Sequence, residues 1–174
     1  MLWFLGSAME NHWGPKRFLT YYLLTGLGAS ALQIGVNAME YFQLSAALDT
    51  GAVETITRDG KDLIERGFNY TNPTWGSLNR FLHGPMGLLH TPMVGASGAV
   101  FGVLLAFGMT FPNQVIYLNF LFPIKAKYFV IGYGLLELYN GFSVSNSGIA
   151  HFAHLGGMLF GYILIRKWRR DMYL

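Results

Sequence analysis

The sequence predicts an all-α protein, a polytopic bundle of transmembrane helices, on three observations. The 174 residues are 52% hydrophobic and only 12% charged, whereas ordinary soluble domains are about 25% charged. Long apolar runs without charge approach the roughly 20 helical residues that cross a bilayer. Lysine and arginine gather at alternate ends of these runs, as the positive-inside rule requires. The length suits one membrane domain, residues 1–174.

Four spans follow in chain order. Residues 18–38 hold 21 positions without a charge, residues 93–111 hold 19 and residues 148–165 hold 18. Residues 128–142 form a shorter span that contains Glu137. Because a carboxylate that faces lipid is costly, we expect Glu137 to face the bundle interior.

Basic residues set the expected orientation. They precede the first span, separate the second from the third and follow the last: Lys16, Arg17, Lys125, Lys127, Arg166, Lys167, Arg169 and Arg170. These sites and the C-terminus are therefore expected on the cytoplasmic side. Residues 40–92 then form the outer loop, with a charge run typical of a solvated face. Residues 1–9 are apolar but too short to cross, and we interpret them as the tail of a truncated helix.

Composition excludes other classes of protein. The net charge of +3 is too small and too scattered for nucleic-acid binding. The absence of cysteine excludes a disulfide framework and thiolate metal sites.

Two polar residues within the spans indicate chemistry. Ser97 lies in GASGAVFG, residues 95–102, and His151 lies in AHFAHLGG, residues 150–157. A hydroxyl and an imidazole in a membrane need partners, and the expected topology puts both near the outer ends of inward-running helices. We therefore predict a Ser/His dyad with Ser97 as nucleophile and His151 as general base. No aspartate lies in a span, so a full triad is not expected.

Small residues around Ser97 have two interpretations. Gly95, Ala96 and Gly98 would bring backbone N–H groups at a helix start close to a substrate oxyanion. The alternative is close helix packing through GxxxG spacings, at Gly98, Gly102, Gly157 and Gly161. Phe101 lies one turn after Ser97, where its ring either stacks on the imidazole of His151 or fills the core.

A metal site is not expected. His151 and His154 share a helix face at i and i+3 and could ligate a metal. A third ligand is hard to find, however, because the chain has no cysteine and no HExxH motif.

These residues resemble the rhomboid family of intramembrane serine proteases. GASG resembles the family's GxSG with Ser97 as nucleophile, and AHFAHLGG resembles its last-helix motif, whose first histidine, here His151, is the base. Glu10, Gly14 and Phe18 resemble its ExxxGxxxF loop.

The resemblance implies a six-helix bundle with a water-filled outer cavity, of which the four spans are helices three to six. It implies a serine endopeptidase, without a cofactor, that cleaves transmembrane segments of other proteins within the lipid bilayer. The family's HxxxN residues, which help to hold the oxyanion, would precede Met1, so we expect Met1 to be an internal methionine of a longer protein. Phe101 stands where the family often has tyrosine.

Two alternatives stay open. The first is a catalytically inactive rhomboid-like binder of membrane helices, since the upstream oxyanion residues are absent from this sequence. The second is a fragment of a transporter or channel. A bacterial inner membrane is the expected location, and the sequence leaves the oligomeric state open.

Overall fold

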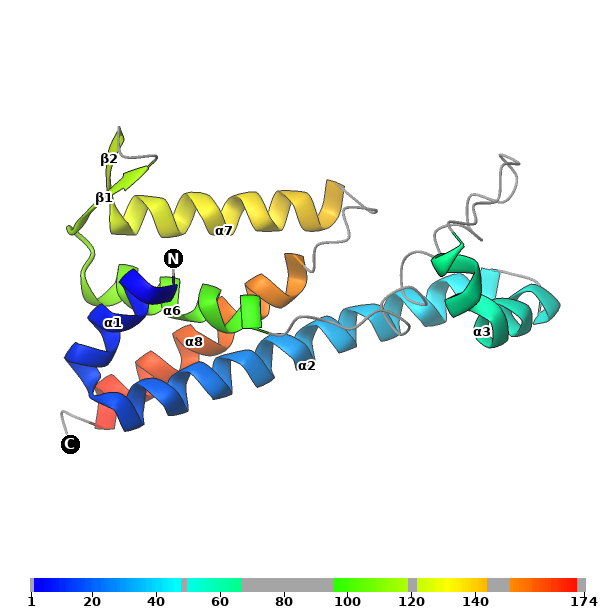
Figure 1. Ribbon diagram of the computed structural model, residues 1–174, viewed down its shortest axis with the longest axis horizontal. Helices are drawn as coiled ribbons and strands as arrows, with labels where there is room; N and C mark the ends of the chain where they lie inside the picture. The colour runs from blue at the N-terminus through cyan, green and yellow to red at the C-terminus, as the bar shows by residue number, and fades with distance from the viewer. Residues whose placement is uncertain (1, 48–49, 67–95, 119–121, 144–150, 172–174) are drawn as a thin grey trace. The chain divides into compact units, whose positions relative to one another are not determined.

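The computed structural model describes residues 2–47, 50–66, 96–118, 122–143 and 151–171, which are almost entirely helical (Figure 1). The elements are α1 (Leu2–Trp13), α2 (Pro15–Ala47), α3 (Thr50–Glu65), α6 (Ala96–Thr110), β1 (Val115–Leu118), β2 (Phe122–Lys125), α7 (Ala126–Ser143) and α8 (His151–Asp171). The predicted all-α fold class is confirmed. The short antiparallel hairpin of β1 and β2 was not predicted.

The chain forms two compact units. The first unit comprises residues 1–33, 95–143 and 150–174, and the second comprises residues 34–94 and 144–149. The first unit contains every predicted site residue.

The predicted spans correspond to long helices. Residues 18–38 lie within α2 and residues 128–142 within α7. The other two predicted spans begin outside the described residues, and their described parts lie in α6 and α8. The apolar stretch 1–9 continues to Trp13 as part of α1.

A glycine turn separates α1 from α2. Gly14 has φ of 81°, a left-handed conformation that favours glycine, and its N–H donates to the Glu10 carbonyl at 2.7 Å. Pro15 then opens α2 at the first helical position, where a missing N–H costs nothing. This turn accounts for Glu10 and Gly14 of the predicted ExxxGxxxF loop.

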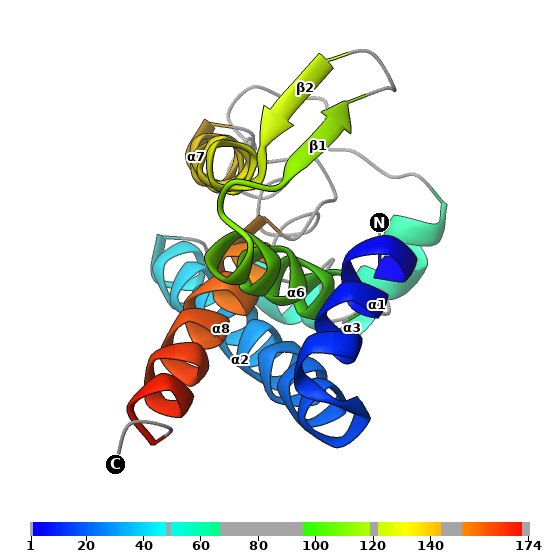
Figure 2. The ribbon, with the colours of Figure 1, turned by 90° about the vertical axis from the view of Figure 1, so that its left-hand side faces the viewer.

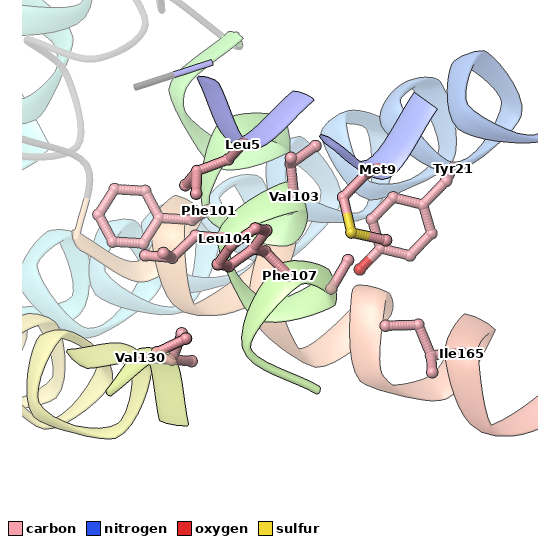
Figure 3. Close-up of a cluster of buried hydrophobic side chains, with 11 residues drawn as sticks. Leu5, Met9, Tyr21, Phe101, Val103, Leu104, Phe107, Val130 and Ile165 are labelled. Carbon is pink, nitrogen blue, oxygen red and sulfur yellow. The ribbon is translucent and has the colours of Figure 1, made fainter. Parts of the chain in front are cut away.

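The core is built around α6. This helix is apolar on all sides and buries most of its residues, and it packs against α1, α7 and α8 (Figure 2). Side chains from five helices meet in one apolar cluster (Figure 3), in which the labelled residues are Leu5, Met9, Tyr21, Phe101, Val103, Leu104, Phe107, Val130 and Ile165.

Contacts between the helices give their relative directions. Tyr21 lies against Gly161 and Ala29 against Gly156, so α2 and α8 are antiparallel. Gly134 faces Met158 and Gly141 faces Phe152, so α7 and α8 are antiparallel as well. Helices α6 and α8 are parallel, because Gly98 lies beside Gly157 and Gly102 beside Gly161. The alternation of directions matches the one deduced from the basic residues.

Hydrophobic exposure is concentrated on α2 and α7. Large apolar side chains that are more than half exposed include Leu23, Leu27, Ile131, Leu135 and Phe142. Contiguous apolar surface of this kind marks a membrane or protein contact. Among the described residues, one helical stretch, Pro15–Gln43 with mean hydropathy 1.2, is long and apolar enough to cross a bilayer, which by itself is weak evidence. The apolar helix at Ala96–Thr110 is shorter.

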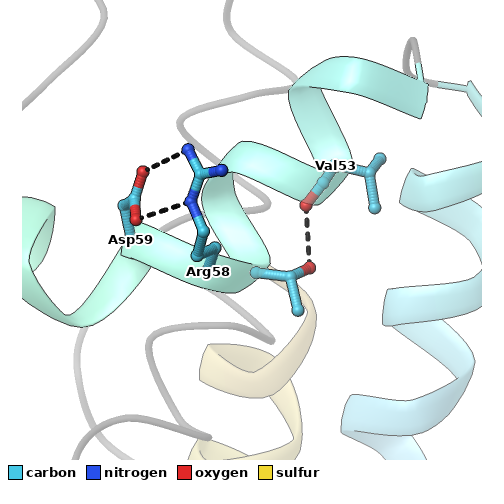
Figure 4. Close-up of polar contacts among 4 residues, drawn as sticks. Val53, Arg58 and Asp59 are labelled. Carbon is cyan, nitrogen blue, oxygen red and sulfur yellow. Dashed lines mark hydrogen bonds and ion pairs between the residues drawn. The ribbon is translucent and has the colours of Figure 1, made fainter.

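The described part of the second unit includes α3, which carries the charge run of the predicted outer loop. Arg58 and Asp59 form two contacts of 3.0 Å at the surface (Figure 4), and Arg66 pairs with Asp62 at 2.9 Å. The hydrogen bond from Arg58 lowers the pKa of the exposed Asp59 carboxyl. Exposed pairs of this kind add little stability, so this stretch is a solvated helical face, as predicted.

Glycines let α6 and α8 touch through their backbones. A Cβ atom on Gly157 would collide with the carbonyl of Gly98, and a Cβ on Gly98 would collide with Ala29 and lie 3.0 Å from the Ala153 oxygen. A Cβ on Gly102 would lie 2.8 Å from the Thr25 side chain. Small residues therefore allow α6 to lie close to both α8 and α2.

We expect Gly157→Ala to destabilise the protein, because the new methyl meets backbone atoms of α6 that have no rotamer to change. Overpacking of this kind costs about 1–3 kcal/mol. The measurement is the thermal unfolding midpoint in detergent. Gly132→Ala is the matched control, since nothing lies within 4 Å of a Cβ there. Equal midpoints for the two variants would contradict the proposed close contact.

Candidate functional site

Ser97 lies in the first turn of α6, where it is half-buried. Backbone N–H groups in the first turn of a helix have no partner within the helix. Ala96 is exposed and Gly98 is buried in the same turn, so the structure keeps these two predicted oxyanion residues beside Ser97. Gly95, the third, lies outside the described residues.

Two buried histidines open α8, and Glu137 of α7 lies against both. Glu137 Oε2 is 2.6 Å from Nδ1 of His151 and 3.0 Å from Nδ1 of His154. The exposed fractions of Glu137, His151 and His154 are 7%, 7% and 8%. The prediction that Glu137 faces the bundle interior is confirmed. Its pairing with the histidines was not predicted.

Phe101 stacks on a histidine, but not on the one expected. Its ring lies 4.0 Å from that of His154, with 8° between the planes. The ring of Tyr133 lies 5.4 Å from that of Phe101. The predicted stacking of Phe101 on His151 is thus corrected to His154, because the rotation of α8 turns His154 toward α6.

The contact between α6 and α8 explains that rotation. Gly157 points at the carbonyl of Gly98. His154 precedes Gly157 by three residues, which turns its side chain about 60° from this contact direction. His151 precedes Gly157 by six residues and is turned about 120° away. His154 therefore points between α6 and α7, while His151 points toward Glu137 on α7.

The register of α6 against α8 also favours His154 as the histidine level with Ser97. A Cβ on Gly98 would contact Ala153, and one on Gly157 would contact Gly98. His154 lies between Ala153 and Gly157, level with Gly98 and hence with its neighbour Ser97. His151 lies before this interval, about one helical turn further along the axis.

Gln33 anchors the start of α8. This residue of α2 is buried, and its side-chain oxygen accepts a hydrogen bond from the backbone N–H of Ala153 at 2.9 Å. The N–H groups of a helix's first turn need such external acceptors. The bond fixes the helical turn that carries His151 and His154 against α2.

The site also contains three possible metal ligands, although no metal was expected. They are the side chains of Glu137, His151 and His154. The expectation that a third ligand is hard to find is wrong, because Glu137 lies beside both histidines. The donor atoms lie within 4.8 Å of one another, whereas zinc at 2.0–2.1 Å from each would draw tetrahedral ligands to about 3.4 Å apart. The separation of 2.6 Å between His151 Nδ1 and Glu137 Oε2 is that of a short, direct hydrogen bond.

Sequence reasoning missed two partners in this site. Gln33 is an amide in an uncharged apolar run, and a buried amide of this kind signals a specific hydrogen bond. Glu137 was recognised as buried but not as the partner of the histidines. The carboxylate itself was the sequence signal for this pairing, because a buried carboxylate needs hydrogen-bond donors.

Comparison with known proteins gives two matches. A model of the Rhomboid domain matches residues 67–170. RHOMBOID-like protein 12, mitochondrial, from Arabidopsis thaliana is 29% identical over 175 aligned positions, which cover 99% of this chain. The chain spans only 41% of the length of that relative. No solved structure matches the chain.

We expect Gln33→Leu to lower stability, because it leaves the buried N–H of Ala153 without this acceptor. A buried donor that loses its partner costs about 1–3 kcal/mol. The thermal unfolding midpoint in detergent measures the change. Gln43→Leu is the matched control, since Gln43 is an exposed glutamine on the same helix. A midpoint for Gln33→Leu at or above that of the control would refute the anchoring role.

Proposed function

This chain belongs to the rhomboid family, and on that premise we propose that it is an intramembrane serine endopeptidase with Ser97 as nucleophile and His154 as general base. The observation that carries the assignment is the stacking of Phe101 on His154 at 4.0 Å. Phe101 lies one turn after Ser97 on the same face of α6. We propose that the histidine that stacks on Phe101 is also the one that reaches Ser97.

This assignment exchanges the roles of the two histidines relative to the sequence prediction. His151 was expected to be the base from its position in the last-helix motif. The packing of α8 favours His154, which lies level with Gly98, and gives His151 a hydrogen bond to Glu137 at 2.6 Å.

The proposed reaction is acyl transfer to Ser97. His154 takes the proton from Ser97 Oγ as that oxygen attacks a peptide carbonyl. Backbone N–H groups of the first turn of α6 stabilise the oxyanion. His154 then protonates the leaving amine, and water hydrolyses the acyl-enzyme. The proposed substrate is the transmembrane segment of another membrane protein, unwound near its outer end.

The basic ends of the helices support an orientation. Arg17 of α2 lies 4.6 Å above the ring of Trp168 on α8, and Trp13 of α1 packs 5.7 Å from the same ring. Tryptophan and basic side chains gather where a bundle meets the cytoplasmic interface. We infer that this end faces the cytoplasm and that the membrane is a bacterial plasma membrane.

We expect Ser97→Ala and His154→Ala each to lower cleavage of a model transmembrane substrate by a factor of about 10³ or more. His151→Ala should keep a larger residual rate, because it removes a neighbour of the base and not the base. The assay uses the full-length protein in proteoliposomes, with a fluorophosphonate probe to report the reactivity of Ser97.

The same experiment separates the alternatives. Cleavage that survives Ser97→Ala would refute the protease assignment. Failure of the wild-type protein to react with the probe or to cleave any substrate would favour an inactive rhomboid-like binder. Complete loss in His151→Ala, with activity kept in His154→Ala, would return the base role to His151.

Fusions to the C-terminus test the orientation in a bacterial membrane. We expect green fluorescent protein at the C-terminus to fluoresce and alkaline phosphatase there to be inactive, because the basic end of α8 stays in the cytoplasm. Active alkaline phosphatase at this position would reverse the proposed topology.

A further inference from the structure

Glu137 is a buried acid that the proposed dyad does not use. Its side chain is 10% exposed, at a depth where a lone carboxylate is costly. Its oxygen Oε2 contacts both histidines of α8, at 2.6 Å and 3.0 Å. Two imidazoles therefore converge on a single carboxylate oxygen atom.

The chemistry of the carboxylate decides which tautomer each histidine adopts. An ionised carboxylate only accepts hydrogen bonds, so it favours imidazoles that carry their proton on Nδ1. An imidazole protonated on Nδ1 has its lone pair on Nε2. For His154, Nε2 is the atom that must accept the proton of Ser97.

The two contacts are unequal, and this fits different roles. His151 makes the 2.6 Å hydrogen bond, which holds the carboxylate in place. Nδ1 of His154 lies 3.0 Å from the same oxygen but makes no well-directed hydrogen bond among the described residues. Catalytic hydrogen bonds are often poorly aligned in the resting enzyme and tighten when the base becomes charged.

We propose that Glu137 is a positioning residue that completes a Ser97–His154–Glu137 triad, with His151 as the clamp on the carboxylate. Glu137 holds the proton of His154 on Nδ1 and stabilises the imidazolium that forms when Ser97 loses its proton. The proton moves from Ser97 Oγ to His154 Nε2, and Glu137 stays ionised throughout. This inference rests on the proposed function and adds an acid to a site expected to be a dyad.

The aromatic ring of Phe101 also supports the proposed triad. Phe101 stacks flat on His154 at 4.0 Å and fixes the plane of the ring. In the proposed triad, Glu137 fixes the orientation of the ring within that plane when the hydrogen bond tightens on the charged base. Together they leave the base one arrangement, which is the condition for efficient proton transfer.

The test is a series of substitutions at Glu137 in the full-length protein, with kcat and KM measured on a model transmembrane substrate. We expect Glu137→Gln to lower kcat by about 10²–10⁴-fold, by analogy with amide replacement of the acid in a serine protease triad. KM should change little, because Glu137 does not touch substrate. Glu137→Asp, which keeps the charge, should recover part of kcat. Tyr139→Phe, an exposed change on the same helix, is the control and should leave kcat unchanged.

The outcomes separate this inference from the proposed function. Full kcat in Glu137→Gln, with activity abolished by Ser97→Ala, would overturn the triad and leave the protease. Activity retained in Ser97→Ala would overturn both. Treatment with EDTA should leave kcat unchanged, and a loss restored by zinc would instead assign the three donors to a metal.

A spectroscopic readout covers variants that fail to fold. Nitrogen-15 NMR of labelled histidine in the folded Ser97→Ala protein, assigned with His154→Gln, reports the tautomer of His154 directly. We expect the proton on Nδ1. A neutral His154 protonated on Nε2 would overturn the proposal without any activity measurement.

Discussion

Backbone contact between α6 and α8 is the constraint on which the site depends. The space that a Gly157 side chain would need is filled by the carbonyl of Gly98. In a membrane, helices gain little from hydrophobic association with one another, and close approach through small residues replaces it with van der Waals contact. This contact fixes the distance, the register and the rotation of α8 together. The direction in which His154 points follows from it.

Buried polar groups then link the helices in pairs. The Tyr21 hydroxyl donates to the carbonyl of Gly102 at 2.8 Å, which ties α2 to α6. Gln33 ties α2 to the first turn of α8, and Glu137 ties α7 to the same turn. Because an unpaired polar group in an apolar interior is costly, each link favours one arrangement of the helices. The turn that carries the two histidines is held from both sides.

Sequence predicts most of this fold and part of the site, for physical reasons. Ser97 could be identified because a hydroxyl between glycines at a helix start is a local pattern. The burial of Glu137 could be predicted because the cost of a charge in lipid is a property of the residue itself. The hairpin of β1 and β2 could not be predicted, because four-residue strands are too short to show a clear alternation of apolar and polar residues.

Sequence alone could not decide which of His151 and His154 to propose as the general base. Both are imidazoles on one helix face, and the rotation and register of α8 against α6 distinguish them. That rotation depends on Gly157 meeting Gly98, residues far apart in sequence whose contact no local pattern specifies.

Glu137 and the two histidines would each lose solvation free energy if buried alone, and their pairing offsets both losses. Taken separately, a carboxylate in one span and two imidazoles in the next each predict a loss of solvation free energy. The antiparallel arrangement of α7 and α8 brings the acid to His151 across 14 positions of the chain. Once paired, the acid forms a hydrogen bond with His151 and lies 3.0 Å from Nδ1 of His154, and the burial that made each group expensive strengthens their attraction. The membrane is therefore a setting in which a buried acid and a buried histidine offset one another's cost.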